Sequence, residues 1–127
     1  MNRSFRTLAL GYAESAPLTA VAQALTMDCD PSGTALVQVL AAASLTGCTL
    51  TFEGRTSPNA PWIVLAAYAT NGTAKGTVIA ITPTLTAVPA NGWLVSTNGC
   101  IQVRARVSAI TTGSITLAMR LSDSSHG

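Results

Sequence analysis

Few side chains in this chain of 127 residues could carry out acid–base, nucleophilic or metal chemistry. The single histidine, His126, is the penultimate residue, so a Ser-His-Asp or Cys-His arrangement would depend on a group on the C-terminal tail. The acidic residues are spread along the chain, without the spacing of a metal site or a glycosidase pair: Glu14, Asp28, Asp30, Glu53 and Asp123. We therefore predict no catalytic residue, no bound metal and no cofactor, and hence a protein that is not an enzyme.

The cysteines also give no sign of a reactive or metal-binding site. Cys29, Cys48 and Cys100 are an odd number of thiols without C-x-x-C spacing, which argues against a zinc site and against a disulfide framework. Free thiols are the simplest interpretation. A disulfide between Cys48 and Cys100 is the alternative, because both residues stand at the start of expected strands.

The two tryptophans raise the possibility of carbohydrate binding, since sandwich proteins that bind sugars use exposed aromatic rings. Trp62 is in phase with the apolar residues two and four positions further on, so we expect it in the core. Trp93 follows Asn-Gly at the start of a strand and is the better candidate for a surface aromatic. A glycan site would therefore use Trp93 together with Asn71, in the loop of residues 71–76.

Charged residues make up only 9% of the chain, against about 25% in an average globular protein. A surface with so little charge favours association, and it suits a protein covered by neighbours. The net charge of +2 is scattered, and only Arg104 and Arg106 lie close together, so no nucleic-acid partner is expected. No apolar run reaches about 18 residues, so no membrane span is expected either.

Apolar residues recur at every second position, the period of a strand with one buried face. Residues 49–56 and 61–65 form the first expected hairpin, in which Glu53 is a solvent-facing residue paired with Arg104 or Arg106. The second expected hairpin points these residues inward: Ile101, Val103, Ala105, Val107, Ile115, Leu117, Met119 and Leu121. About eight short strands separated by Gly, Pro and Asn indicate an all-β, antiparallel β-sandwich that is jelly-roll-like.

The chain divides into an N-terminal arm (1–17), the sandwich (18–122) and a polar tail (123–127). The arm is either a frayed terminus or an extension that lies across a neighbouring subunit. Its candidate contact residues are Arg3, Phe5, Arg6 and Tyr12. The outward residues Arg104 and Arg106 are the second candidate contacts, because arginine is favoured at interfaces.

Two stretches together resemble a known class of proteins. The first is Thr51-Phe52-Glu53-Gly54-Arg55 with Trp62 after a short turn, and the second is residues 103–109 with 112–117. This combination, over residues 19–121, resembles small β-sandwich virion proteins of tailed bacteriophages. The chain departs from the pattern at Arg55, where Ser is usual, and at Asn59-Ala60-Pro61, where Asp-Gly is usual.

The resemblance implies a structural protein of the virion, made in the host cytoplasm. The favoured hypothesis is a capsid decoration (cement) protein that bridges neighbouring major capsid subunits as an oligomer, expected to be a homotrimer. The alternative is a tail, baseplate or fibre-associated module that binds host glycans. A tail-tube or head-to-tail connector subunit is a third option.

Overall fold

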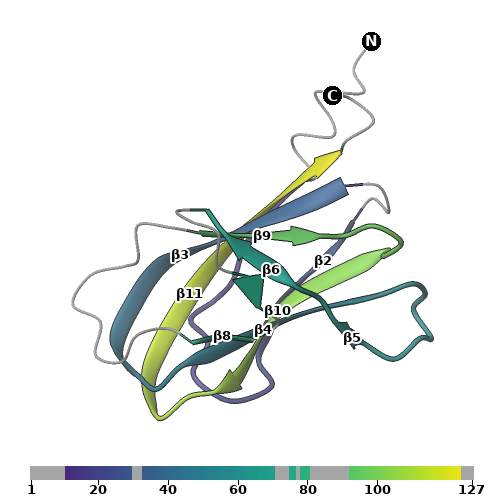
Figure 1. Cartoon of the computed structure of the whole chain (residues 1–127). Helices are drawn as coiled ribbons and strands as arrows, with labels where there is room; N and C mark the ends of the chain where they lie inside the picture. The colour runs from purple at the N-terminus through teal and green to yellow at the C-terminus, as the bar shows by residue number, and fades with distance from the viewer. Residues whose placement is uncertain (1–10, 30–32, 71–74, 77, 81–91, 124–127) are drawn as a thin grey trace.

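The computed structural model describes residues 11–29, 33–70, 75–76, 78–80 and 92–123. Two antiparallel sheets pack face to face, and no helix occurs among these residues (Figure 1). The predicted all-β sandwich is therefore confirmed. Eleven strands lie in the described part of the chain, where about eight were expected, and the additional ones are only two or three residues long.

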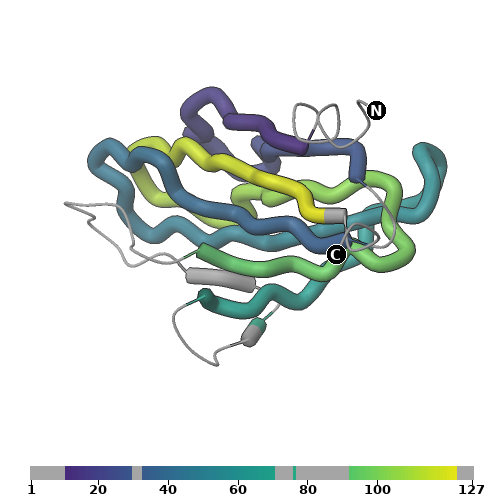
Figure 2. The backbone as a smooth tube through the Cα atoms, turned by 90° about the horizontal axis from the view of Figure 1, so that it is seen from above, coloured from purple at the N-terminus to yellow at the C-terminus, as the bar shows by residue number. Residues whose placement is uncertain are grey.

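Sheet A has six strands. Their order across the sheet is β1 (Tyr12–Glu14), β11 (Thr112–Asp123), β3 (Gly33–Thr46), β9 (Gly92–Ser96), β6 (Ala67–Ala69) and β7 (Lys75–Gly76). Figure 2 shows this order from the purple N-terminal segment through yellow β11 and blue β3 to green β9 and teal β6. The long strands β3 and β11 pair over most of their length and form the centre of the sheet.

Sheet B has five strands. The order β2 (Ala24–Asp28), β10 (Gln102–Ala109), β4 (Thr49–Arg55) and β5 (Ile63–Val64) is completed by β8 (Val78–Ala80), which also pairs with β4. Alternate residues of the two sheets fill the space between them, as the period of a strand requires. Fully buried members include Val37, Leu50, Phe52, Val103, Val107, Ile115, Leu117 and Met119. The inward residues predicted for 103–107 and 115–119 are thus confirmed.

The predicted hairpin of residues 101–108 with 114–121 is wrong. β10 pairs with β2 and β4 in sheet B, whereas β11 pairs with β1 and β3 in sheet A, so the chain crosses from one sheet to the other at residues 110–111. Alternating apolar residues look the same whether the next strand lies beside the first or folds over onto the opposite sheet. A strand pattern therefore fixes the inward face and leaves the pairing partner open.

The crossing is possible because two sharp corners of the chain lie against each other. β3 passes into β4 at Gly47, and the backbone N–H of Thr111 in the other corner donates to the carbonyl of Thr46 at 2.9 Å. Gly113 has a φ of +92°, and a β-carbon there would lie 2.4 Å from the carbonyl oxygen of Ser44. Only glycine fits this left-handed position so close to another backbone.

The first predicted hairpin is confirmed. β4 pairs with β5 so that Glu53 is opposite Val64 and Gly54 is opposite Ile63. At the far end of β4, a β-carbon on Gly54 would approach the Sγ of Cys100 to 2.6 Å. Cys48 precedes the other end of the same strand and lies six residues before Gly54, so roughly 20 Å of extended chain separates the two thiols.

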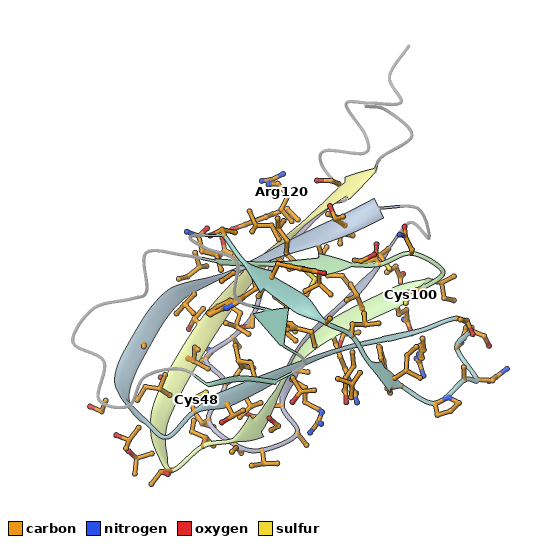
Figure 3. The ribbon with its side chains drawn as sticks, in the orientation of Figure 1. Cys48, Cys100 and Arg120 are labelled. Carbon is orange, nitrogen blue, oxygen red and sulfur yellow. The ribbon has the colours of Figure 1, made fainter. Side chains whose placement is uncertain are left out.

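The three cysteines form no disulfide. Figure 3 shows Cys48 and Cys100 at opposite ends of the sandwich, and a disulfide needs α-carbons within about 7 Å. The alternative of a Cys48–Cys100 bridge is therefore excluded by the fold. The Sγ of Cys29 lies instead 3.3 Å from the carbonyl oxygen of Cys100.

The end of the predicted N-terminal arm belongs to the sandwich itself. β1 is the edge strand of sheet A, with Tyr12 opposite Arg120, and the N–H of Leu121 donates to the carbonyl of Gly11 at 2.7 Å. Leu18 is buried and forms a bridge to Ile115. Residues 11–17 are thus held along β11 of their own subunit.

Candidate interaction surfaces

Glu53 is the centre of a charged cluster on the outer face of sheet B. The Nε of Arg104 donates to its Oε1 at 2.7 Å, while the Nε and Nη2 of Arg106 donate to Oε1 and Oε2 at 3.0 and 3.2 Å. The predicted pairing with these arginines is confirmed for both. The prediction that Glu53 faces solvent is wrong: only 6% of it is exposed, because the arginine side chains lie over it.

The two guanidinium groups determine the charge state of this carboxylate. Burial alone would raise the pKa of Glu53, but the hydrogen bonds and positive charges of Arg106 and Arg104 outweigh it and hold the pKa below its ordinary value. Glu53 is therefore ionised at neutral pH. Among the described residues it is the one buried acid, and because it is ionised and bound on both oxygens, its arrangement is structural and suits neither a general acid nor a general base.

Trp62 extends the cluster toward the edge of sheet B. The guanidinium carbons of Arg55 and Arg104 lie 4.5 and 4.2 Å from the centroid of its ring, both within cation–π distance. The Nε of Arg55 donates to Gln102 at 2.7 Å, and the amide of Gln102 donates to Asp28 at 2.9 Å. These contacts fix long, flexible side chains in a surface network that spans β2, β10 and β4. We call residues 28, 53, 55, 62, 102, 104 and 106 the arginine–tryptophan face.

The predicted positions of the two tryptophans are reversed in the structure. Trp62, expected in the core, is half-buried on the outer face of sheet B. Residues 62–65 are all apolar, so alternation does not show which of them point inward. In addition, β5 is an edge strand whose two residues are both exposed. The sequence contains a signal for this position that alternation does not detect. Two arginines, Arg55 and Arg104, are available to cover one aromatic ring.

Trp93, expected at the surface, is only 5% exposed, and its ring centroid lies 6.3 Å from that of Phe52 in the core. It stands opposite Val37 of β3, with Leu94 on the outer side of the same strand. A buried ring cannot stack on a sugar, so the predicted glycan contact at Trp93 is wrong. Its predicted companion, Asn71, lies outside the described residues.

A row of large side chains crosses the outer face of sheet A. Tyr12, Arg120, Leu36, Leu94 and Tyr68 are successive cross-strand partners on β1, β11, β3, β9 and β6. Leu36, Leu94 and Tyr68 are 38%, 43% and 49% exposed. The guanidinium carbon of Arg120 lies 4.6 Å from the ring centroid of Tyr12, and Figure 3 shows Arg120 on the outside of the sheet. We call these five residues the leucine–tyrosine row.

Three of the remaining predicted site residues lie on the two outer faces of the sandwich. Arg104 and Arg106 lie together in the arginine–tryptophan face, and Tyr12 lies at the end of the leucine–tyrosine row on the other sheet. Arg3, Phe5 and Arg6 lie outside the described residues. Apart from Tyr12, sequence reasoning missed the leucine–tyrosine row, although a leucine on the outer phase of β3 was a signal that this face is not fully solvated.

The described ranges contain no group of three or more cysteine, histidine or acidic side chains that could hold a metal ion. Within the same ranges, no helix has the length and hydropathy needed to cross a membrane. The side-chain contacts of the arginine–tryptophan face and the exposed apolar residues of the leucine–tyrosine row make the two outer faces candidate interaction surfaces.

No protein-family model and no curated sequence matches the chain. Among solved structures, the fold is similar to that of the SPBc2 prophage-derived protein YomS, with a TM-score of 0.62 and 13% identity over 87% of this chain and 95% of the other. It is also similar to the PBSX exported protein XepA, with a TM-score of 0.60 and 14% identity over 87% of this chain and 38% of the other. At this level of identity the likeness establishes a shared β-sandwich fold.

Proposed function

We propose that this chain is a structural protein of a bacteriophage particle, which acts by binding its neighbours and catalyses no reaction. The fold neighbour YomS, named as a prophage-derived protein, supports the association with a phage, and the resemblance of residues 51–62 and 103–117 supports a place in the virion. Within that role we propose capsid decoration, in which the protein self-associates and bridges neighbouring major capsid subunits. Neither a nucleic acid nor a membrane is a partner in this proposal.

The observation that carries the proposal is the composition of the two outer faces. Sheet B presents arginines beside a half-buried tryptophan, and sheet A presents exposed leucines and tyrosines. Tryptophan, tyrosine and arginine are the residues most enriched at protein interfaces and at their energetic centres. Only 9% of the residues in this chain are charged, and its two outer faces present tryptophan, tyrosine and arginine. Such a chain is suited to being enclosed by neighbours.

The arginine–tryptophan face is the proposed contact with the capsid. Its arginines are already held by Glu53, Gln102 and Trp62, so little side-chain freedom remains to be lost on binding. Their remaining N–H groups can donate to carbonyl and carboxylate oxygens of a partner. Repetition of one modest contact over many capsid sites then gives stable attachment. Arg3, Phe5 and Arg6 are proposed to add contacts from the arm.

The test is particle binding by purified protein. Capsids that lack the protein are mixed with wild type or with Trp62→Ala, and bound protein is measured after sedimentation. We expect Trp62→Ala to bind at least about tenfold more weakly, the cost typical of losing an aromatic residue at the centre of an interface. Val21→Ala, in the exposed turn before β2 and outside the seven residues of the arginine–tryptophan face, is the control and should bind as wild type does. Equal binding by Trp62→Ala, or no binding by wild type, would refute the proposal.

A further inference from the structure

The outward residues on either side of the leucine–tyrosine row determine how far it stands above the sheet. On one side the neighbouring outward positions are Ser122, Thr34 and Ser96, which are cross-strand partners of one another. On the other side the corresponding positions on β11 and β3 are Ala118 and Gln38. Serine, threonine and alanine are shorter than leucine, so, apart from Gln38, the flanking residues let the two leucines and Tyr68 stand above the sheet as a continuous apolar ridge.

We propose that this ridge is a self-association surface, on which a second copy of the chain packs face to face about a two-fold axis parallel to the strands. This goes beyond the proposed structural role, because it names the surface, the partner and the symmetry. A two-fold contact must be self-complementary, so that each residue meets a suitable residue of the other copy. The order of the five residues along the leucine–tyrosine row meets this requirement in one orientation of the second copy.

With the axis parallel to the strands and between β3 and β9, the row of the second copy runs in reverse. Leu36 then meets Leu94 of the second copy in an apolar contact. Arg120 meets Tyr68 of the second copy, which places a cation beside an aromatic ring. With the axis along the row, Arg120 would meet Arg120 of the second copy, and like charges would face each other. Charge complementarity therefore selects the first orientation.

The area is sufficient for a weak to moderate dimer. Five strand positions at about 4.8 Å and outward residues over about 20–24 Å of β3 give a face of roughly 500 Å² per copy, before side-chain relief is counted. Two such faces bury about 1,000 Å² or somewhat more, at the lower limit of specific interfaces. We expect a dimer that dissociates on dilution, in place of the trimer that the virion resemblance implies.

The first experiment measures the mass of the full chain by sedimentation equilibrium over a dilution series. We expect a monomer–dimer equilibrium that Leu94→Asp weakens at least about thirtyfold, because a charge would be buried at the centre of the contact. Ile63→Asp, which places the same charge at an exposed apolar position on sheet B, is the control and should dimerise as wild type does. Thermal unfolding of each variant verifies that it is folded.

The second experiment tests the orientation. In a Cys29→Ser background, Arg120→Cys and Tyr68→Cys proteins are prepared separately and treated with a short bifunctional maleimide. We expect covalent dimers when the two are mixed and few in either alone, since copies of one position lie three strands, about 14 Å, apart along the row. Efficient dimers of Arg120→Cys alone would contradict the orientation.

Three results would overturn the inference as a whole. The first is a monomer at every concentration, the second is a trimer, and the third is equal weakening by Leu94→Asp and Ile63→Asp. Loss of particle binding in Leu94→Asp while wild type stays monomeric would assign the ridge to another virion protein and would equally refute self-association. None of these results bears on the binding test with Trp62→Ala, so the two proposals fail separately.

Discussion

Replacement of Glu53 by glutamine tests the charged cluster that organises the outer face of sheet B. The carboxylate accepts three hydrogen bonds from Arg104 and Arg106, at 2.7, 3.0 and 3.2 Å, while only 8% of its side chain is exposed. Glutamine has nearly the same shape and keeps one acceptor oxygen. The change therefore removes the negative charge between two guanidinium groups without opening a cavity.

The expected loss of stability follows from the burial of the partners. Removing one member of a fully buried ion pair costs about 3–5 kcal/mol, because a charge is left without compensation. The side chains of Arg104 and Arg106 are still 23% and 25% exposed, so water solvates part of the charge that is left. Glutamine also retains a hydrogen-bond acceptor. We therefore expect Glu53→Gln to lower the free energy of unfolding by about 2 kcal/mol and Tm by about 6–10 °C.

The pH dependence provides an independent check. Because the folded-state pKa of Glu53 lies below its ordinary value of 4.5, the stabilisation is complete above that pH and is lost as the pH falls through the folded-state pKa. The stability difference between wild type and Glu53→Gln should thus be largest at neutral pH and shrink below about pH 4.5. Urea unfolding followed by circular dichroism at a series of pH values measures this difference.

Asp28→Asn is the matched control, because it makes the same chemical change at an exposed acid that accepts one hydrogen bond, from Gln102. It should change stability by less than about 0.5 kcal/mol. A loss in Glu53→Gln that is no greater than in Asp28→Asn would refute the role of the buried carboxylate. A difference from wild type that does not vary with pH would refute the ionised state assigned to Glu53.

Two further predictions follow from the backbone and from the tryptophans. Gly113→Ala should destabilise the protein by at least about 1 kcal/mol more than Gly99→Ala, because both residues have positive φ but only at Gly113 would the β-carbon meet another backbone; equal losses in chemical unfolding would contradict the corner packing. In Trp93→Phe, the ratio of iodide quenching to caesium quenching of the remaining Trp62 should exceed the ratio for free N-acetyltryptophanamide, because Arg55 and Arg104 attract anions to its ring. A ratio no greater than that of the free amide, measured by fluorescence, would show that these arginines do not lie against the ring.

Much of the fold could be predicted because a strand with one buried face leaves a period of two in the sequence. Val103, Ala105 and Val107 are inward for this reason, and so is Phe52 on β4. The pairing of strands could not be predicted in the same way. β11 turns onto sheet A through Gly113, and nothing in its alternation distinguishes that path from a hairpin with β10.

The candidate surfaces were predictable only in part, and the reason lies in cross-strand contacts. The pairing of Glu53 with Arg104 and Arg106 followed from their outward positions on adjacent strands. The predicted position of Trp62 was wrong because the residues that follow it are all apolar, so their pattern does not show which side of the strand faces the core. Its surroundings are determined by two arginines on other parts of the chain. The leucine–tyrosine row joins five strands that are far apart in the chain, so it becomes visible only once the order of the sheet is known.

The central claim is that the protein is a structural component of a phage particle, and its copy number in the particle tests this most directly. Purified particles from a host that carries the gene would be analysed by quantitative mass spectrometry against the major capsid protein. We predict that the protein stays with particles through density-gradient purification, in a fixed and high ratio to the major capsid protein. Its absence from purified particles would contradict the structural role, and a ratio of only a few copies per particle would contradict capsid decoration and place the protein in the tail.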